Sequence, residues 1–115
     1  MDNWGGKVTA IELVQGQLDA YNARNLQVFC TYFAEDVIVI DGRSQECLFS
    51  GMEAFRERYQ RTFSNSELHC HLLNRIEQGD IVIDHEEVSG MGEELVYAIA
   101  VYQIENGRIQ KVTFY

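Results

Sequence analysis

Three short turn sequences divide the second half of the chain into strand-length segments. They are Gln78-Gly79-Asp80, Ser89-Gly90-Met91-Gly92 and Asn106-Gly107, and each carries residues that tight hairpin turns favour. The segments that they separate, from Glu67 onward, have strand character. A last segment, 108–115, completes what we expect to be an antiparallel meander.

The first half of the chain has a helical period instead. Apolar residues recur at steps of three and four from Val8 to Tyr21, which indicates a helix with one buried face. Thr9 and Glu12 are spaced as a capping box, so this helix should begin near Ala10.

Two further helices are predicted before the meander. An apolar series from Leu26 to Phe33 follows Asn25 and indicates a short second helix that ends at Glu35-Asp36. Ser50 and Glu53 are spaced as the capping box of a third helix. The apolar positions of that third helix are Met52, Phe55, Tyr59 and Phe63.

Between the second and third helices, residues 37–41 read VIVID and predict a strand buried on both faces that closes at an Asp41-Gly42 turn. Helices followed by consecutive hairpins indicate an α+β domain in which helices cover one face of a curved sheet. A chain of 115 residues with 46% hydrophobic content is expected to form one domain, 1–115. Such an arrangement can leave a hollow between the two layers.

The charge balance excludes several kinds of partner. Eighteen acidic and nine basic residues give a net charge of −9, which repels nucleic acid and anionic lipid surfaces. The sequence has neither a signal-peptide pattern nor an apolar run of about 20 residues, so we expect a cytoplasmic protein. Its three cysteines lack the close paired spacing of a zinc site, which favours reduced, structural thiols.

The segment 14–41, VQGQLDAYNARNLQVFCTYFAEDVIVID, resembles the opening of the nuclear transport factor 2-like superfamily, particularly its SnoaL-like and ketosteroid-isomerase-like members. The helix SGMEAFRERY and the terminal hairpin IENGRIQKVTF follow in the order found in that superfamily. The resemblance implies a conical α+β barrel whose helices and bent sheet enclose a pocket, and a homodimer formed through the outer sheet face. The same fold serves isomerases, cyclases and non-catalytic binding domains, so it leaves the activity open.

Asp41 is the residue for which this resemblance implies a catalytic role. Its position is similar to that of the general-base aspartate of ketosteroid isomerases, which moves a proton next to a ketone. A carboxylate desolvated by apolar walls is a better proton acceptor at neutral pH. The alternative is an aspartate that only forms the turn before Gly42.

The two donors that stabilise the enolate in ketosteroid isomerases have no counterparts here. Alignment with those enzymes puts Gln17 in place of the donor tyrosine and Ala100 in place of the donor aspartate, and a methyl group donates no hydrogen bond. Tyr21 lies one helical turn beyond Gln17, and Tyr59 matches a supporting tyrosine of the isomerase network. We therefore do not expect the steroid-isomerase reaction itself.

The strand 80–90 crowds four ionisable residues, Asp84 to Glu87, which must divide between its two faces. The isomerase alignment turns Ile83, His85 and Glu87 toward the cavity and Asp84 and Glu86 outward. His85 would then share a proton with Asp41 or Glu87 and titrate near neutrality. The alternative is a histidine that a neighbouring carboxylate satisfies for structural reasons.

His69 and His71 form an H-x-H pair, and together with Glu86 from the next strand they are candidate metal ligands. The expected hairpin register places the pair on the outer face, where the ligands would not converge. We predict no metal and no cofactor.

The cavity is predicted to hold a small, mainly apolar ligand that is neutral or cationic, because an acidic exterior disfavours strong anions. The leading hypothesis is proton transfer, isomerisation or cyclisation with Asp41 as base and His85 as its partner; the alternative is a non-catalytic ligand-binding or dimerisation module. The residues expected to contact the ligand are Gln17, Tyr21, Phe33, Met52, Phe55, Tyr59, Ile83, Glu87, Ala98, Ala100, Val112 and Phe114.

Overall fold

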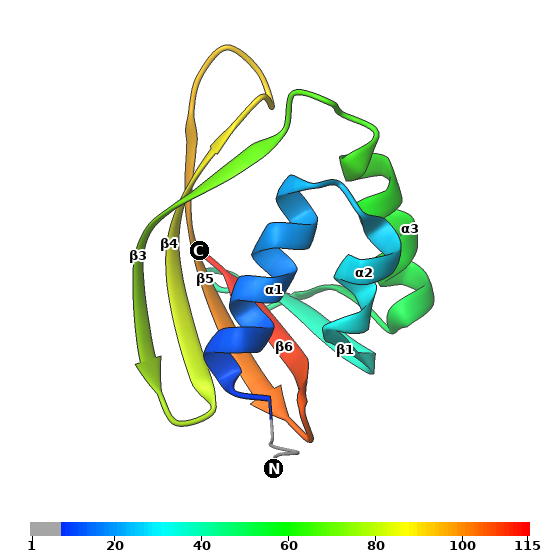
Figure 1. Cartoon of the computed structure of the whole chain (residues 1–115), viewed down its shortest axis with the longest axis vertical. Coiled ribbons are helices and arrows are strands. Elements are labelled where there is room, and N and C mark those ends of the chain that lie inside the picture. The colour runs from blue at the N-terminus through cyan, green and yellow to red at the C-terminus, as the bar shows by residue number, and fades with distance from the viewer. Residues whose placement is uncertain (1–7) are drawn as a thin grey trace.

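A computed structural model describes residues 8–115 and shows three helices packed on one side of a six-stranded curved sheet (Figure 1). The helices are α1 (Ala10–Asn22), α2 (Leu26–Thr31) and α3 (Met52–Phe63). The strands are β1 (Phe33–Asp41), β2 (Cys47–Ser50), β3 (His69–Gln78), β4 (Ile81–Ser89), β5 (Val96–Glu105) and β6 (Arg108–Phe114). The predicted α+β class is confirmed. Within residues 8–115, no helix has the length and apolar character needed to cross a membrane.

The sheet order is β2-β1-β6-β5-β4-β3. Strands β3 to β6 form the predicted antiparallel meander. Strand β1 joins it by parallel pairing with β6, and the short β2, which the sequence analysis missed, pairs antiparallel with β1. The sheet is strongly bent but does not close into a barrel, because β2 and β3 remain its two edges.

Helix α1 begins as its sequence predicts. The Thr9 side chain accepts a hydrogen bond from the Glu12 backbone at 3.1 Å, and the Glu12 carboxylate accepts one from the Thr9 backbone at 2.9 Å. These two bonds satisfy donors that the start of a helix leaves unpaired. Leu13, Val14 and Leu18 then carry the buried face of α1.

Helix α2 is shorter than predicted and ends at Thr31. The Ile109 backbone N–H donates to the Tyr32 carbonyl at 2.9 Å, and Phe33 pairs with Ile109 in the sheet. Pairing with β6 therefore takes Phe33 out of the helix and into β1, and residues 34–36, which were expected at the end of a helix, continue this strand.

The capping box predicted for α3 is wrong. Ser50 is the last residue of β2 and pairs with Ile38. Gly51 takes the N-cap position with φ +84°, a backbone conformation that favours glycine, and no side chain caps this helix. The tight turn from β2 into α3 thus leaves the hydroxyl of Ser50 one residue too early to cap.

Aromatic rings fill the space between the helices and the sheet. Phe29, only 1% exposed, has the ring centres of five aromatic side chains within 4.8 to 6.1 Å. These side chains are Tyr21, Phe33, Phe55, Tyr59 and Phe63. Their burial against β1 anchors α2 and α3 at one end of the sheet.

The outer face of the meander is partly apolar. Ile76 and Tyr97 are 63% and 57% exposed, and they pair with Ile83 and Glu87 of β4. Apolar side chains gathered on an open sheet face are typical of a contact surface. The homodimer expected through this face stays a prediction, and the mass of the protein in solution would test it.

Candidate functional site

A cavity of about 280 Å³ lies between the helices and the inner face of the sheet. Its size is at the lower limit of the roughly 300–1,000 Å³ that ligand sites usually have, so it suits a small organic molecule. Seven of the predicted contact residues line it: Gln17, Tyr21, Phe33, Tyr59, Ala98, Val112 and Phe114. The sequence analysis missed the others, which are Leu18, Phe29, Arg58, Thr62, Cys70, Glu86, Val88, Met91, Val96 and Tyr102.

The face of β4 that lines the cavity is not the one that was predicted. Asp84 is fully buried and Glu86 is 6% exposed, while Ile83, His85 and Glu87 are only partly buried. Glu86 lines the cavity, and its partner across the sheet is Ala98, which lines it too. The carboxylate inside the cavity is therefore Glu86.

Alternation alone did not decide this orientation, because both faces of β4 combine apolar and ionisable residues. The deciding contact is an ion pair with Arg75, which stands opposite Asp84 on β3. Arg75 donates from Nε to Asp84 Oδ1 at 2.7 Å and from Nη2 to Oδ2 at 2.9 Å. A buried carboxylate needs such a partner. A two-residue Gly79-Asp80 turn brings Arg75 opposite Asp84, so this signal was present in the sequence although the sequence analysis did not use it.

Glu86 lies at the end of a short chain of polar groups. The Gln17 side-chain amide donates to Tyr102 Oη at 3.2 Å, and the Tyr102 hydroxyl donates to Glu86 Oε2 at 3.4 Å. Burial, with a further contribution from the negative charge of Asp84, raises the pKa of Glu86 from its ordinary 4.5 to about 7. A carboxyl group of this pKa exchanges its proton readily at neutral pH.

Two tyrosine hydroxyls add hydrogen-bond donors to the cavity wall. Burial raises the pKa of both Tyr21 and Tyr59 well above 10, so both hydroxyls keep their protons. Neither hydroxyl is hydrogen-bonded to another group within residues 8–115. Buried hydroxyls normally have a partner, and here a ligand or water in the cavity can provide it.

Cys70 lines the cavity beside Glu86 and Val88 but lacks the character of a nucleophile. Burial and the nearby Glu86 raise the pKa of its thiol far above neutrality. The attacking form of cysteine is the thiolate, so Cys70 contributes a neutral wall at physiological pH.

One exposed cation, Arg58, lines the same cavity from α3, and Thr62 lies one helical turn further on. The Arg58 guanidinium stacks 5.7 Å from the centre of the Phe49 ring, which holds it at the wall. The cavity therefore has a carboxyl on the sheet side and a guanidinium on the helix side.

Asp41, the predicted base, lies at the end of β1 and is not among the residues that line this cavity. Its Oδ1 accepts hydrogen bonds from the backbone of Arg43 at 2.9 Å and of Ser44 at 3.4 Å. These are the contacts of a turn-forming aspartate, the alternative that the sequence left open.

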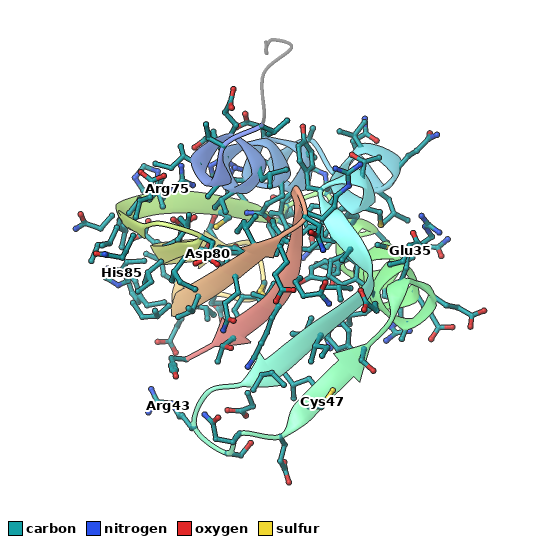
Figure 2. All side chains as sticks on the ribbon, turned by 90° about the horizontal axis from the view of Figure 1, so that it is seen from below. Glu35, Arg43, Cys47, Arg75, Asp80 and His85 are labelled. Atoms are coloured by element: carbon teal, nitrogen blue, oxygen red, sulfur yellow. The ribbon has the colours of Figure 1, made fainter. Side chains whose placement is uncertain are left out.

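The remaining predicted contacts divide between the outer face and the core. Ile83, His85 and Glu87 point away from the cavity, and Figure 2 shows His85 at the outer side of the sheet. Their predicted inward orientation was wrong because Asp84 and Glu86 occupy the inner face.

Met52, Phe55 and Ala100 are buried in the core and do not line the cavity. His69 and His71 are exposed, while Cys70 between them is buried. The two histidines therefore face away from the cavity, as expected, and cannot share a site with Glu86.

The sequence model of the SnoaL-like domain matches residues 14–112, most of the chain. The chain belongs to the SnoaL-like family. No match is found among curated proteins.

Solved structures share the SnoaL-like fold at low sequence identity. An uncharacterised cystatin-fold protein from Novosphingobium aromaticivorans has a TM-score of 0.85 at 20% identity over 94% of this chain and 98% of its own. A candidate polyketide cyclase from Pseudomonas putida has a TM-score of 0.73 at 24% identity, with 94% and 91% covered. A protein of ketosteroid isomerase-like fold from Catenulispora acidiphila, solved with trimethylamine, has a TM-score of 0.74 at 20% identity, with 90% and 84% covered.

The buried Glu86 makes the stability of this SnoaL-like protein depend on pH. Its pKa of about 7 in the folded state exceeds the ordinary 4.5, so the folded state holds the proton more tightly. This contribution to stability is fully present below about pH 4.5 and is lost as the pH rises through about 7. Its size is roughly 3 kcal/mol.

Glu86→Gln stays neutral at every pH. We therefore expect the free energy of unfolding of the variant, minus that of the wild type, to rise by roughly 3 kcal/mol from pH 4.5 to pH 8. Urea unfolding of both proteins at the two pH values measures this difference, and other titrating groups cancel in the comparison. A difference that does not change with pH would contradict the burial of a titrating Glu86.

Proposed function

We propose that this SnoaL-like protein binds a small, mainly apolar carbonyl compound in its cavity and transfers a proton on it through Glu86. The observation that carries the proposal is a carboxyl group with a pKa near 7 inside an aromatic cavity. The resemblance to ketosteroid isomerases implies such a base at Asp41, but Glu86 fits the role better because Glu86 lines the cavity and Asp41 does not.

The reaction follows from the groups in the cavity. The Glu86 carboxylate takes a proton from the carbon next to the carbonyl. The electron pair of that C–H bond forms a C=C bond, and the π pair of the carbonyl moves to its oxygen to give an enolate. Tyr21 or Tyr59 donates a hydrogen bond to this oxygen. Glu86 then returns a proton to the same carbon, which exchanges a hydrogen, or, in a β,γ-unsaturated carbonyl compound, to the γ-carbon of the dienolate, which shifts the double bond into conjugation. No bound cofactor takes part in these steps.

Proton exchange with solvent tests the proposal directly. A panel of small cyclic and aryl ketones is incubated with the wild-type protein in D₂O, and NMR follows the loss of the hydrogen next to the carbonyl. We expect catalysed exchange for compounds that also raise the unfolding temperature, because a ligand stabilises the state that binds it. Binding without exchange across the panel would contradict the proton-transfer step.

An Ala98→Phe variant tests whether the ligand occupies this cavity. Ala98 lies opposite Glu86 on the neighbouring strand, so a phenyl ring there should fill the space beside the carboxyl. At a ligand concentration of about 100 times Kd, binding stabilises the wild type by roughly 2.7 kcal/mol, and we expect the variant to lose this stabilisation. Thermal unfolding with and without ligand measures the loss.

Ile99→Phe is the matched control for this variant. Ile99 is the next residue of β5, pairs with the outward-facing His85 and does not line the cavity. It should keep the ligand response of the wild type. If both variants lost the ligand-induced stabilisation equally, the phenyl ring would be acting by distorting β5. The ligand would then lie outside this cavity.

A second candidate function is non-catalytic binding of a small amine. Glu86 stands among aromatic rings, which attract a cation through their faces, and the related fold from Catenulispora acidiphila was solved with trimethylamine. An amine would bind more tightly as the pH rises through about 7 and Glu86 ionises. Calorimetry measures trimethylamine binding at pH 6 and pH 8. Tighter binding at pH 8 in a protein that does not catalyse proton exchange would support amine binding over proton transfer.

A further inference from the structure

Two buried carboxyl groups lie two residues apart on the inner face of β4, and only one of them has a counter-charge. Asp84 is fully buried and paired with Arg75 through two hydrogen bonds of 2.7 and 2.9 Å. Glu86, at 6% exposure, has the neutral groups of Tyr102, at a long 3.4 Å, and Cys70 as hydrogen-bond partners. Burying a second carboxylate beside the first is unfavourable, which calls for a physical reason.

Arg75 is held firmly in this arrangement. Its Nη1 donates to Gln15 Oε1 on α1 at 2.8 Å, and Gln15 in turn donates to Asp19 at 2.8 Å. Figure 2 shows Arg75 on the side of the sheet next to α1. The guanidinium is therefore anchored by both β4 and α1, and its charge has a defined position relative to Glu86.

Few charges besides this pair act on Glu86. The titratable or charged groups that face it come from α1, α3, β3, β4 and β5; they are Tyr21, Arg58, Tyr59, Cys70, Arg75, Asp84 and Tyr102. The tyrosines and the cysteine remain neutral at pH 7, because burial raises their pKa values. The lining residues of α2, β1 and β6 are apolar. The charged groups are thus Asp84, Arg75 and the exposed Arg58.

We propose that the buried Asp84–Arg75 pair is a positioning element that sets which protonation state Glu86 holds in the cavity. Asp84 shares the inner face of β4 with Glu86 and favours its neutral form, while Arg75 limits that effect. Together they leave Glu86 able to give and accept a proton near neutral pH. This inference deepens the proposed function of Glu86 and rests on it.

The pair acts through charge, so each substitution has a direction. Removing Asp84 leaves an unbalanced guanidinium, which stabilises the Glu86 carboxylate. Removing Arg75 leaves an unbalanced Asp84, which disfavours a second negative charge beside it. A pair that served only to hold β3 against β4 would weaken the fold in both cases but would not shift Glu86 in opposite directions.

The test is a ¹³C NMR titration of the Glu86 side-chain carboxyl, without ligand, in the wild type, Asp84→Asn, Arg75→Gln, the double variant and Arg75→Lys. The Glu86→Gln spectrum assigns the signal. We expect a wild-type midpoint near pH 7, a midpoint lower by about 1 pH unit or more in Asp84→Asn, and an intermediate value in the double variant. In Arg75→Gln the two carboxyls should titrate in two steps, the later one above the wild-type midpoint.

Arg75→Lys is the matched control, because it keeps the positive charge and loses the paired geometry. Its midpoint should stay close to that of the wild type. Thermal unfolding shows whether Arg75→Gln is folded. If it is not, the Glu86 midpoint of Asp84→Asn is compared with that of Arg75→Lys, and the midpoint should be lower in Asp84→Asn. Midpoints that coincide in all variants, or a higher midpoint in Asp84→Asn, would overturn the inference. Neither result would alter the exchange activity of the wild type, which tests the proposed function separately.

Discussion

Glu86→Gln should lower the rate of proton exchange by about 10²- to 10⁴-fold, the usual contribution of a general acid or base. The amide has the shape of the carboxyl but can neither take nor return a proton at neutral pH. The wild-type rate should also rise with pH around a midpoint near 7, where Glu86 becomes the carboxylate that accepts the proton. The variant should have no such step, and NMR exchange rates between pH 5 and pH 9 measure both effects.

Asp41→Asn is the control that separates the two carboxylates. Asp41 accepts backbone hydrogen bonds at 2.9 and 3.4 Å in its turn, so its loss should reduce stability more than the exchange rate. A folded Asp41→Asn protein without exchange would restore Asp41 as the base. An active Glu86→Gln protein would remove Glu86 from the mechanism.

The fold could be predicted in outline because its signals are local. The capping residues Thr9 and Glu12 mark the start of α1, and the Gly79-Asp80 and Asn106-Gly107 turns mark the hairpins. The parallel pairing of β1 with β6 depends on residues far apart in the chain. It decides where α2 ends, and no local pattern reveals it.

The site was harder to predict because it depends on which face of β4 is buried. Glu86 and His85 are neighbours in sequence and point to opposite faces of the strand. Turning the other face inward would therefore place His85 in the cavity and Glu86 outside it. The choice is made by one side chain on the neighbouring strand, Arg75, whose ion pair makes the burial of Asp84 acceptable. The aromatic wall was easier, since Tyr21, Tyr59 and Phe33 were all selected by helical spacing, although Phe33 begins β1 in the structure.

Arg75→Gln should lower the free energy of unfolding by about 3–5 kcal/mol at pH 7, the usual result when one partner of a buried ion pair is removed. Asp84 is fully buried, so no water can replace the two hydrogen bonds that it loses. This loss is large against a total stability of roughly 5–15 kcal/mol for a domain. Urea unfolding monitored by circular dichroism measures it.

Asp84→Asn should be less harmful, because the Arg75 side chain is 13% exposed and can still reach water, whereas the Asp84 side chain is 0% exposed. The double variant should be more stable than Arg75→Gln alone, since it removes the buried charge together with its partner. The same four proteins thus report two separate properties: their unfolding energies measure what the ion pair contributes to the sheet, and their Glu86 titrations measure what it contributes to the cavity. Equal stability of Arg75→Gln and the wild type would mean that water or another group reaches Asp84, and its charge would then be too well screened to act on Glu86.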